Sequence, residues 1–320
     1  MKKTTVHGPV TGLPRIALAF LLALLVVGCG DSSDDDPAAA LPGSVTSANA
    51  PAVANETWTT TSVPIDVLAI YANPDLPLFS GLPFSATASP ALTLPTGTVD
   101  CGPNPADGSL SYALIGTSLV VDFTDCIVAG VTLNGRFTIS NITGDPSACP
   151  GTASFSVAFD NFKVSDALRT IVVNGGYDHT LSVSDNDANP GCETQHHSLA
   201  GTSLTFTVDG EAFVLSGFTI EKTFNSDTGA YSIEFAGTVS SNAAGGTVSA
   251  RTTTPISGNS ADTYPSGGVI EISDGTAIAT MTINNSIPDD PNAVTVAYDA
   301  DGDGTPEVTQ NYSWDALKAM

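Results

Sequence analysis

The residues best suited to chemistry lie in one acidic stretch near the end of the chain. From Tyr298 to Trp314 the sequence is YDADGDGTPEVTQNYSW, in which three aspartates alternate with other residues before a second glycine. Carboxylate oxygens at this spacing can surround Ca²⁺, because the chain turns sharply at a glycine and a backbone carbonyl can add a ligand. We therefore predict a structural calcium site whose ligands are Asp299, Asp301, Asp303, Glu307 and the backbone carbonyl of Thr305.

The flanks of this stretch indicate which kind of loop it is. With Asp299 as position one, position twelve is Gln310, so the bidentate glutamate of an EF-hand is missing. The flanking segments alternate as strands do, and the loop resembles the strand-flanked calcium loops of FG-GAP-type repeats. The alternative is a polar Asp/Gly hairpin turn without an ion. Three neighbouring aspartates repel one another without a cation, which favours the metal.

Little else in the sequence indicates catalysis. The histidines beyond residue 28 are His179, His196 and His197, and the adjacent pair would point to opposite faces of a strand. The chain contains no GxSxG, no HExxH and no glycine-rich phosphate loop. Its many carboxylates are compatible with glycoside hydrolysis, but it has two tryptophans, few for a sugar-binding cleft. We expect a protein that is not an enzyme, with a secreted hydrolase as the alternative.

The first 28 residues indicate secretion. Lys2, Lys3 and Arg15 precede an apolar run that is too short for a comfortable transmembrane helix. The run ends in VVGC, which resembles the bacterial lipobox. This resemblance implies cleavage before Cys29 and acylation of that cysteine, for example with palmitate, so that the chain is anchored in a membrane. Gly30 follows instead of Asp, which implies the outer membrane, in a periplasmic or surface-facing position.

The net charge of the chain limits which classes of partner it can bind. The chain carries 33 Asp and Glu against nine Lys and Arg, a formal net charge of −24. Such a surface repels phosphate backbones, so nucleic-acid binding is excluded. Residues 29–56 contain almost no large apolar side chain, and we predict that they form the lipidated cysteine and a flexible tether.

The cysteines indicate an oxidising compartment. Besides Cys29 there are four, Cys101, Cys126, Cys149 and Cys192. An even number in the periplasm predicts two disulfides, for which three connectivities exist. The segments between the first two and between the last two each resemble a pair of strands joined by a turn. A hairpin brings its ends together, so we favour pairing Cys101 with Cys126 and Cys149 with Cys192.

The pattern from residue 109 to residue 320 predicts an all-β domain. Apolar residues such as Phe155, Val157 and Phe159 alternate with Ser, Thr and Ala, which is typical of antiparallel sheets with one packed and one wet face. About twelve strands would form a curved antiparallel meander, half-open and barrel-like, with a closed barrel or a β-sandwich as alternatives. Residues 57–108 are proline-rich and would cover the sheet or plug it, with a short helix from Pro64 to Ala72.

An internal repeat supports the curved sheet. Three segments share an alternating strand, a polar turn and an apolar residue followed by Asn or Ser and then Gly. The glycines are Gly135, Gly175 and Gly217, which lie 40 and 42 residues apart. Such a spacing predicts a repeated pair of strands that must pack with its neighbours to bury its apolar face. We expect the glycines to lie at bulges where the sheet bends.

Taken together, the lipobox, the cysteine-bracketed hairpin, the LNGRFTIS type of repeat and the YDADGDGTPE loop resemble a group of uncharacterised proteobacterial outer-membrane lipoproteins. The resemblance implies no activity. We expect a non-enzymatic, lipid-anchored envelope protein that is a structural or binding module, with an acyl chain or another apolar ligand on its concave face. The alternative is a surface-interaction lipoprotein without a small ligand.

Overall fold

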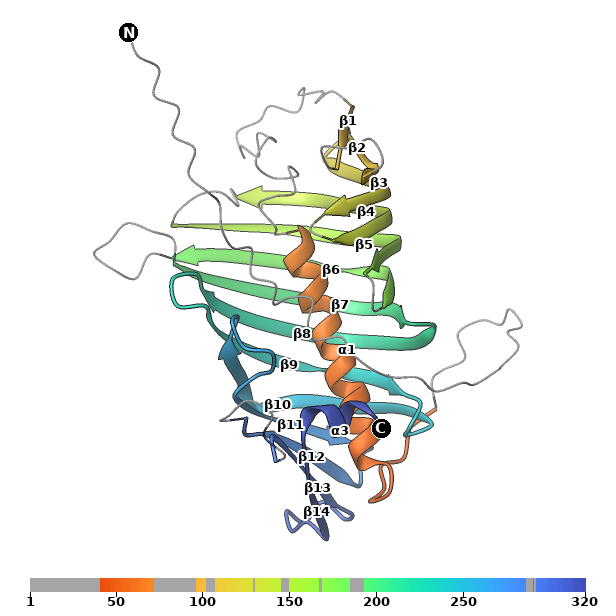
Figure 1. Cartoon of the computed structure of the whole chain (residues 1–320), viewed down its shortest axis with the longest axis vertical. Helices are drawn as coiled ribbons and strands as arrows, with labels where there is room; N and C mark the ends of the chain where they lie inside the picture. Colours follow the sequence, from red (N-terminus) through yellow and green to blue (C-terminus); the bar gives the residue numbers. More distant parts are fainter. Residues whose placement is uncertain are drawn as a thin grey trace.

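The computed structural model describes residues 41–71, 96–101, 107–128, 130–144, 150–166, 169–184, 193–285, 290 and 292–320. Within these residues, 14 strands form one antiparallel sheet in which each strand pairs with the next along the chain (Figure 1). Their bounds are β1 Gly97–Asp100, β2 Ser109–Ile115, β3 Ser118–Val128, β4 Val131–Gly144, β5 Gly151–Ser165, β6 Thr170–Ser184, β7 Thr194–Val208, β8 Glu211–Asn225, β9 Ala230–Ser241, β10 Gly246–Asn259, β11 Gly267–Ser273, β12 Ile278–Ile283, β13 Val294–Asp299 and β14 Val308–Tyr312.

The curved meander predicted from the sequence is confirmed. Strands β1 and β14 are the two edges and do not pair with each other, so the sheet is open and is neither a closed barrel nor a two-sheet sandwich. The alternation of residue types produces the two faces as expected. In β5, Phe155, Val157 and Phe159 are buried, whereas Ala158 between them is exposed.

The repeated glycines lie where the sheet bends, as predicted. Gly135, Gly175 and Gly217 have φ angles of 88°, 98° and 53° and lie at or next to breaks in the strand register. A Cβ on Gly135 would lie 2.1 Å from the carbonyl oxygen of Asn161, so no other residue fits there. The Asn174 side chain accepts a hydrogen bond from the Asn161 N–H at 2.7 Å, which ties this bulge to the next strand.

A long helix covers the inner face of the sheet. Helix α1, Ala50–Tyr71, has 22 residues and crosses several strands (Figure 1). It begins 14 residues before Pro64, where the sequence analysis placed the start of a short helix, so that prediction was wrong. Threonine and proline disfavour a helix on their own. Here tertiary packing stabilises it, because Val53, Ala54 and Val63 are almost fully buried.

Residues 41–49, which we call the strap, are also part of the fold. The Gly43 N–H donates to the Thr247 carbonyl at 2.8 Å, and the Val45 N–H donates to Asp274 Oδ2 at 2.8 Å. Asn49 Nδ2 donates to the Ala243 carbonyl at 2.9 Å. The predicted tether of residues 29–56 is therefore wrong from residue 41 onward. Its small residues fit closely against the sheet, a packing that composition alone does not predict.

The half-buried carboxylate of Glu56 ties α1 to the turn between β9 and β10. Glu56 accepts a 2.5 Å hydrogen bond from the Ser241 hydroxyl and 3.2 Å hydrogen bonds from the Ala243 N–H. Burial raises the pKa of Glu56, while the hydrogen bonds from Ser241 and Ala243 oppose that rise. This carboxylate thus has a structural role at the turn between β9 and β10.

The chain ends in a short helix that packs against α1. Helix α3, Trp314–Lys318, begins after Ser313, whose hydroxyl accepts the Ala316 N–H. Trp314 lies 5.4 Å from Trp58 of α1, measured between ring centroids, and is stacked on Tyr264 at 5.1 Å. No helix in the described part of the chain is long and apolar enough to cross a membrane.

One of the two predicted disulfides is confirmed. Cys101 and Cys126 are bonded, with a Cα–Cα distance of 5.3 Å, and they close a loop at the start of the sheet. Cys149 and Cys192 lie outside the described residues, as does Cys29.

The Cys101–Cys126 bond should contribute measurably to stability. Replacing both cysteines with alanine should lower the free energy of unfolding by about 3 kcal/mol, mostly because the unfolded chain loses the constraint on a loop of this size. Denaturant titration under oxidising conditions measures the change. A double variant as stable as the wild type would contradict a structural role for this bond.

Candidate functional site

The aspartate loop joins β13 to β14 and is organised around Asp299. This residue ends β13 and is buried. Its Oδ1 accepts the Gly302 N–H at 2.7 Å, and its Oδ2 accepts the Gly304 N–H at 2.7 Å. Gly302 and Gly304 have φ angles of 71° and 90°, a region that glycine adopts without strain. The two glycines therefore let the loop curl around the Asp299 carboxylate.

Three carboxylates meet in this loop. Asp299, Asp301 and Glu307 each bring an oxygen within 4.8 Å of the others, so the group could hold a metal ion. The Ala300 N–H donates to Glu307 Oε2 at 2.7 Å, which holds Glu307 across the base of the loop. Asp303 is not in the group and accepts the Thr305 N–H at 2.7 Å instead. The structure thus brings together three of the four side chains that the sequence predicted.

The charge state of Asp299 suits a cation. Burial raises its pKa, but the N–H groups of Gly304, Gly302, Asp301 and Asp303 more than offset that effect, so the pKa lies below its usual value. The carboxylate is therefore ionised at neutral pH. The same hydrogen bonds also stabilise the hairpin turn itself. Asp301 and Glu307 are exposed.

A second titratable group lies on the inner face of the sheet. His179 of β6 and His197 of β7 are both buried, and His179 Nε2 lies 3.1 Å from His197 Nδ1. His197 Nε2 in turn lies 3.4 Å from Gln195 Oε1, which can only accept, so we assign the proton of His197 to Nε2. His197 Nδ1 then accepts from His179 Nε2. The hydrogen bonds run in one direction from His179 to Gln195.

Both histidines are neutral at physiological pH. Burial lowers the pKa of His179 to about 4, and burial together with His179, Lys222 and His196 lowers the pKa of His197 to about 3. His196, the next residue, lies on the outer face, where its Nε2 is 3.3 Å from Glu221 Oε2. The opposite orientation of the two neighbours is as predicted. The pairing with His179 was missed, because it depends on the register of β6 against β7.

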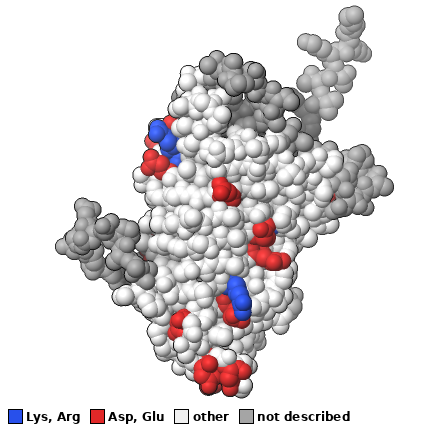
Figure 2. All heavy atoms as spheres, turned by 180° about the vertical axis from the view of Figure 1, so that it is seen from behind, with Lys and Arg blue, Asp and Glu red and all other residues white. Residues whose placement is uncertain are grey.

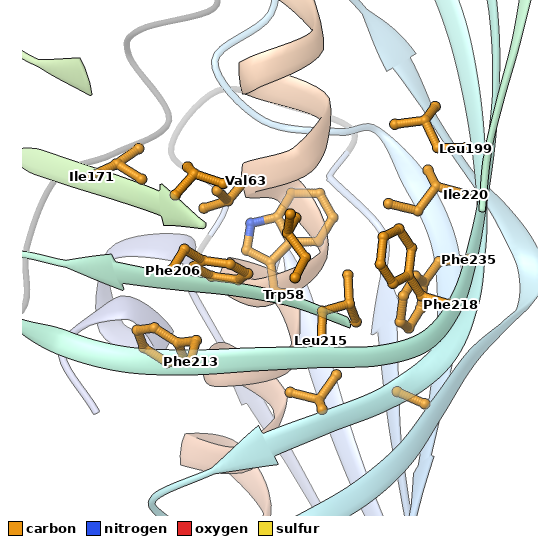
Figure 3. Close-up of a cluster of buried hydrophobic side chains, with 14 of the residues drawn as sticks. Trp58, Val63, Ile171, Leu199, Phe206, Phe213, Leu215, Phe218, Ile220 and Phe235 are labelled. Atoms are coloured by element: carbon orange, nitrogen blue, oxygen red, sulfur yellow. The ribbon is translucent and has the colours of Figure 1, made fainter. Parts of the chain in front are cut away.

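The inner face around α1 is filled by apolar side chains. Figure 3 shows Trp58 and Val63 of α1 among Phe206, Leu215 and Phe235 of the sheet. Leu215 and Val63 are 0% exposed and Phe206 is 2% exposed. The helix therefore lies where an apolar ligand on the concave face would have to bind.

No family model, no curated protein and no solved structure matches the chain.

Proposed function

We propose that this chain is a non-enzymatic, lipid-anchored protein of the outer membrane whose curved sheet is a structural or surface-interaction module. The observation that carries the proposal is the position of α1 on the concave face. A carrier of acyl chains needs an apolar surface that its ligand can reach. Here Trp58 and Val63 occupy that surface, which favours a module without a small apolar ligand over a carrier.

The outer face is the surface that remains for a partner. Seen from behind in Figure 2, it carries few Lys, Arg, Asp or Glu side chains and these lie in small groups. Two of the basic residues are paired with acidic neighbours across strands, Arg136 with Asp122 at 2.6 Å and Arg251 with Glu271 at 2.7 Å. A broad face of mostly uncharged polar groups is suited to hydrogen bonding with another surface, not to binding a charged ligand.

The titratable groups described above support a non-enzymatic role. Glu56, a carboxylate whose pKa is raised by burial, accepts hydrogen bonds from Ser241 and Ala243 and so holds the helix in place. The His179–His197 pair is buried on the inner face and is hydrogen-bonded to Gln195. Neither group is placed as an acid or base for a solvent-exposed substrate. A secreted hydrolase remains the alternative.

Acylation is tested directly by growth with labelled palmitate. The proposal predicts that the wild-type chain incorporates label and fractionates with outer membranes, and that Cys29→Ser does neither. An unlabelled wild-type chain would overturn the lipid anchor.

We further propose that the Asp299, Asp301 and Glu307 group binds Ca²⁺ and thereby closes the last hairpin. At a Ca²⁺ concentration 100 times the Kd, binding should raise the free energy of unfolding by about 3 kcal/mol relative to the chelated protein. Asp301→Ala should abolish the difference, because it removes an exposed carboxylate from the group.

The matched control is Asp303→Ala. Asp303 lies in the same loop and has the same charge, but its carboxylate is outside the group of three. This variant should keep most of the calcium dependence when unfolding is followed with and without chelator. Wild-type unfolding that is unaffected by the chelator would leave the loop as a hairpin turn without an ion.

A further inference from the structure

The attachment of the strap suggests how the molecule sits on a membrane. In an antiparallel meander, successive turns alternate between two ends of the sheet. We define the near end by the turns 209–210, 242–245 and 274–277 and the loop 300–307. The far end has the turns 226–229 and 260–266. The strap enters the fold at the near end, beside the start of β10.

The strap is fixed there by several hydrogen bonds. The Thr247 N–H donates to the Leu41 carbonyl at 2.9 Å, and the Ser44 N–H donates to the Ala244 carbonyl at 2.9 Å. Val45 is held by Asp274 in the next turn of the same end. Gly302 of the aspartate loop packs against that turn, where an added Cβ would lie 3.0 Å from the Thr276 carbonyl oxygen. The described part of the chain therefore begins at the near end.

The chain between the lipid and the strap is short. Leu41 lies 12 residues after Cys29, and a fully extended chain covers at most about 3.6 Å per residue, so this distance is at most about 43 Å. Strand β10 has 14 residues. Thr247 pairs with Ser240 of β9 and Asn259 pairs with Ala230, so the bulges in β10 leave ten residue steps of sheet between Thr247 and the far end. At about 3.3 Å per step this distance is about 33 Å. Contact through the far end would need the tether extended over about three quarters of its maximum length, at a high cost in conformational entropy.

We propose that the near end faces the lipid surface in which Cys29 is anchored, and that the far end points away from it. The inference rests on the proposed lipid anchor. Asp209, Glu211 and Asp274, together with the exposed Asp301, Asp303 and Glu307 of the aspartate loop, make the near end acidic, and an anionic bilayer repels it. This repulsion is screened within about 8 Å at physiological ionic strength, a distance that the tether easily spans. Charge therefore affects the distance between the protein and the membrane, whereas the short tether determines which end of the sheet faces the membrane.

Energy transfer to a labelled membrane tests this orientation. The acylated full chain is incorporated into vesicles of phosphatidylcholine with one fifth phosphatidylglycerol and a trace of acceptor lipid. A fluorescent amino acid is introduced by nonsense suppression at Thr276, an exposed residue of the near end, or at Asp227, an exposed residue of the far end. We expect at least twofold more transfer from the Thr276 label. Equal transfer, or more from the Asp227 label, overturns the proposed orientation.

Two controls separate the possible failures. A chain that does not float with the vesicles overturns the lipid anchor itself, whereas a chain that floats with the reversed transfer order overturns the orientation alone. Inserting a Gly/Ser segment of about 20 residues between Ala39 and Ala40 lengthens the tether without touching the strap. The difference between the two labels should then shrink. An unchanged difference would show that tether length does not select the end.

Discussion

Replacing Trp58 with alanine should lower the free energy of unfolding by about 3–5 kcal/mol, the loss typical of a large aromatic side chain removed from a packed interior. Trp58 is 8% exposed, faces Phe206 and Leu215 of the sheet, and packs against Trp314. Its removal would leave a cavity between α1, α3 and the sheet. Urea titration measures the change.

Two variants make this result specific. Trp58→Phe keeps an aromatic ring in the same place and should recover much of the lost stability. Ile115→Ala removes an apolar side chain that is 66% exposed, and it should change stability by less than about 0.5 kcal/mol. If Trp58→Ala were as stable as the wild type, α1 would not be an integral part of the core, and the concave face would be open to a ligand.

Acidification should destabilise the protein through His179 and His197. The pKa values of these residues in the folded state are about 4 and about 3, below the usual value of 6.5. Between pH 6.5 and those values the unfolded chain binds more protons than the folded one, so stability falls as pH falls. Above pH 6.5 both states leave these histidines neutral, so this pair does not make stability depend on pH. By pH 4 the loss from His179 alone should be on the order of 3 kcal/mol.

The contribution of His179 and His197 to the pH dependence of stability can be isolated by comparing a variant of this pair with a variant of the adjacent His196. The double variant His179→Gln and His197→Gln should have a flatter dependence of stability on pH between about 6.5 and 4, whatever its absolute stability. His196→Gln changes the next residue, which lies on the outer face near Glu221, and it should keep the wild-type slope in that window. Equal slopes for the wild type and the double variant would contradict the burial of the two histidines as neutral groups.

The parts of the fold that follow from local periodicity could be predicted. The alternation around Phe155, Val157 and Phe159 determines which face of a strand is buried, and it predicted the antiparallel meander. Gly135 and Gly175 marked bulges because their backbone conformations exclude other residues. The Cys101–Cys126 bond followed from the closeness of hairpin ends.

The parts of the fold that depend on contacts between residues distant in sequence could not be predicted. Residues 41–56 have the composition of a tether, and only the sheet that they pack on makes them ordered, through partners such as Thr247 and Asp274. His179 and His197 meet because of a register between strands that no local pattern specifies. In the aspartate loop, spacing alone did not distinguish Asp303, whose carboxylate holds the Thr305 N–H, from the carboxylates that converge.

The central proposal is that the protein's own helix, which fills the concave face, leaves no room there for an apolar ligand. Native mass spectrometry of residues 30–320, secreted to the periplasm behind a signal peptide without a lipobox so that no anchor is added, tests it most directly. We predict the mass of the polypeptide, with an added mass of about 38 Da for one Ca²⁺ less two protons that disappears with chelator. A co-purified lipid that stays bound through desolvation would contradict the account and identify the protein as a carrier.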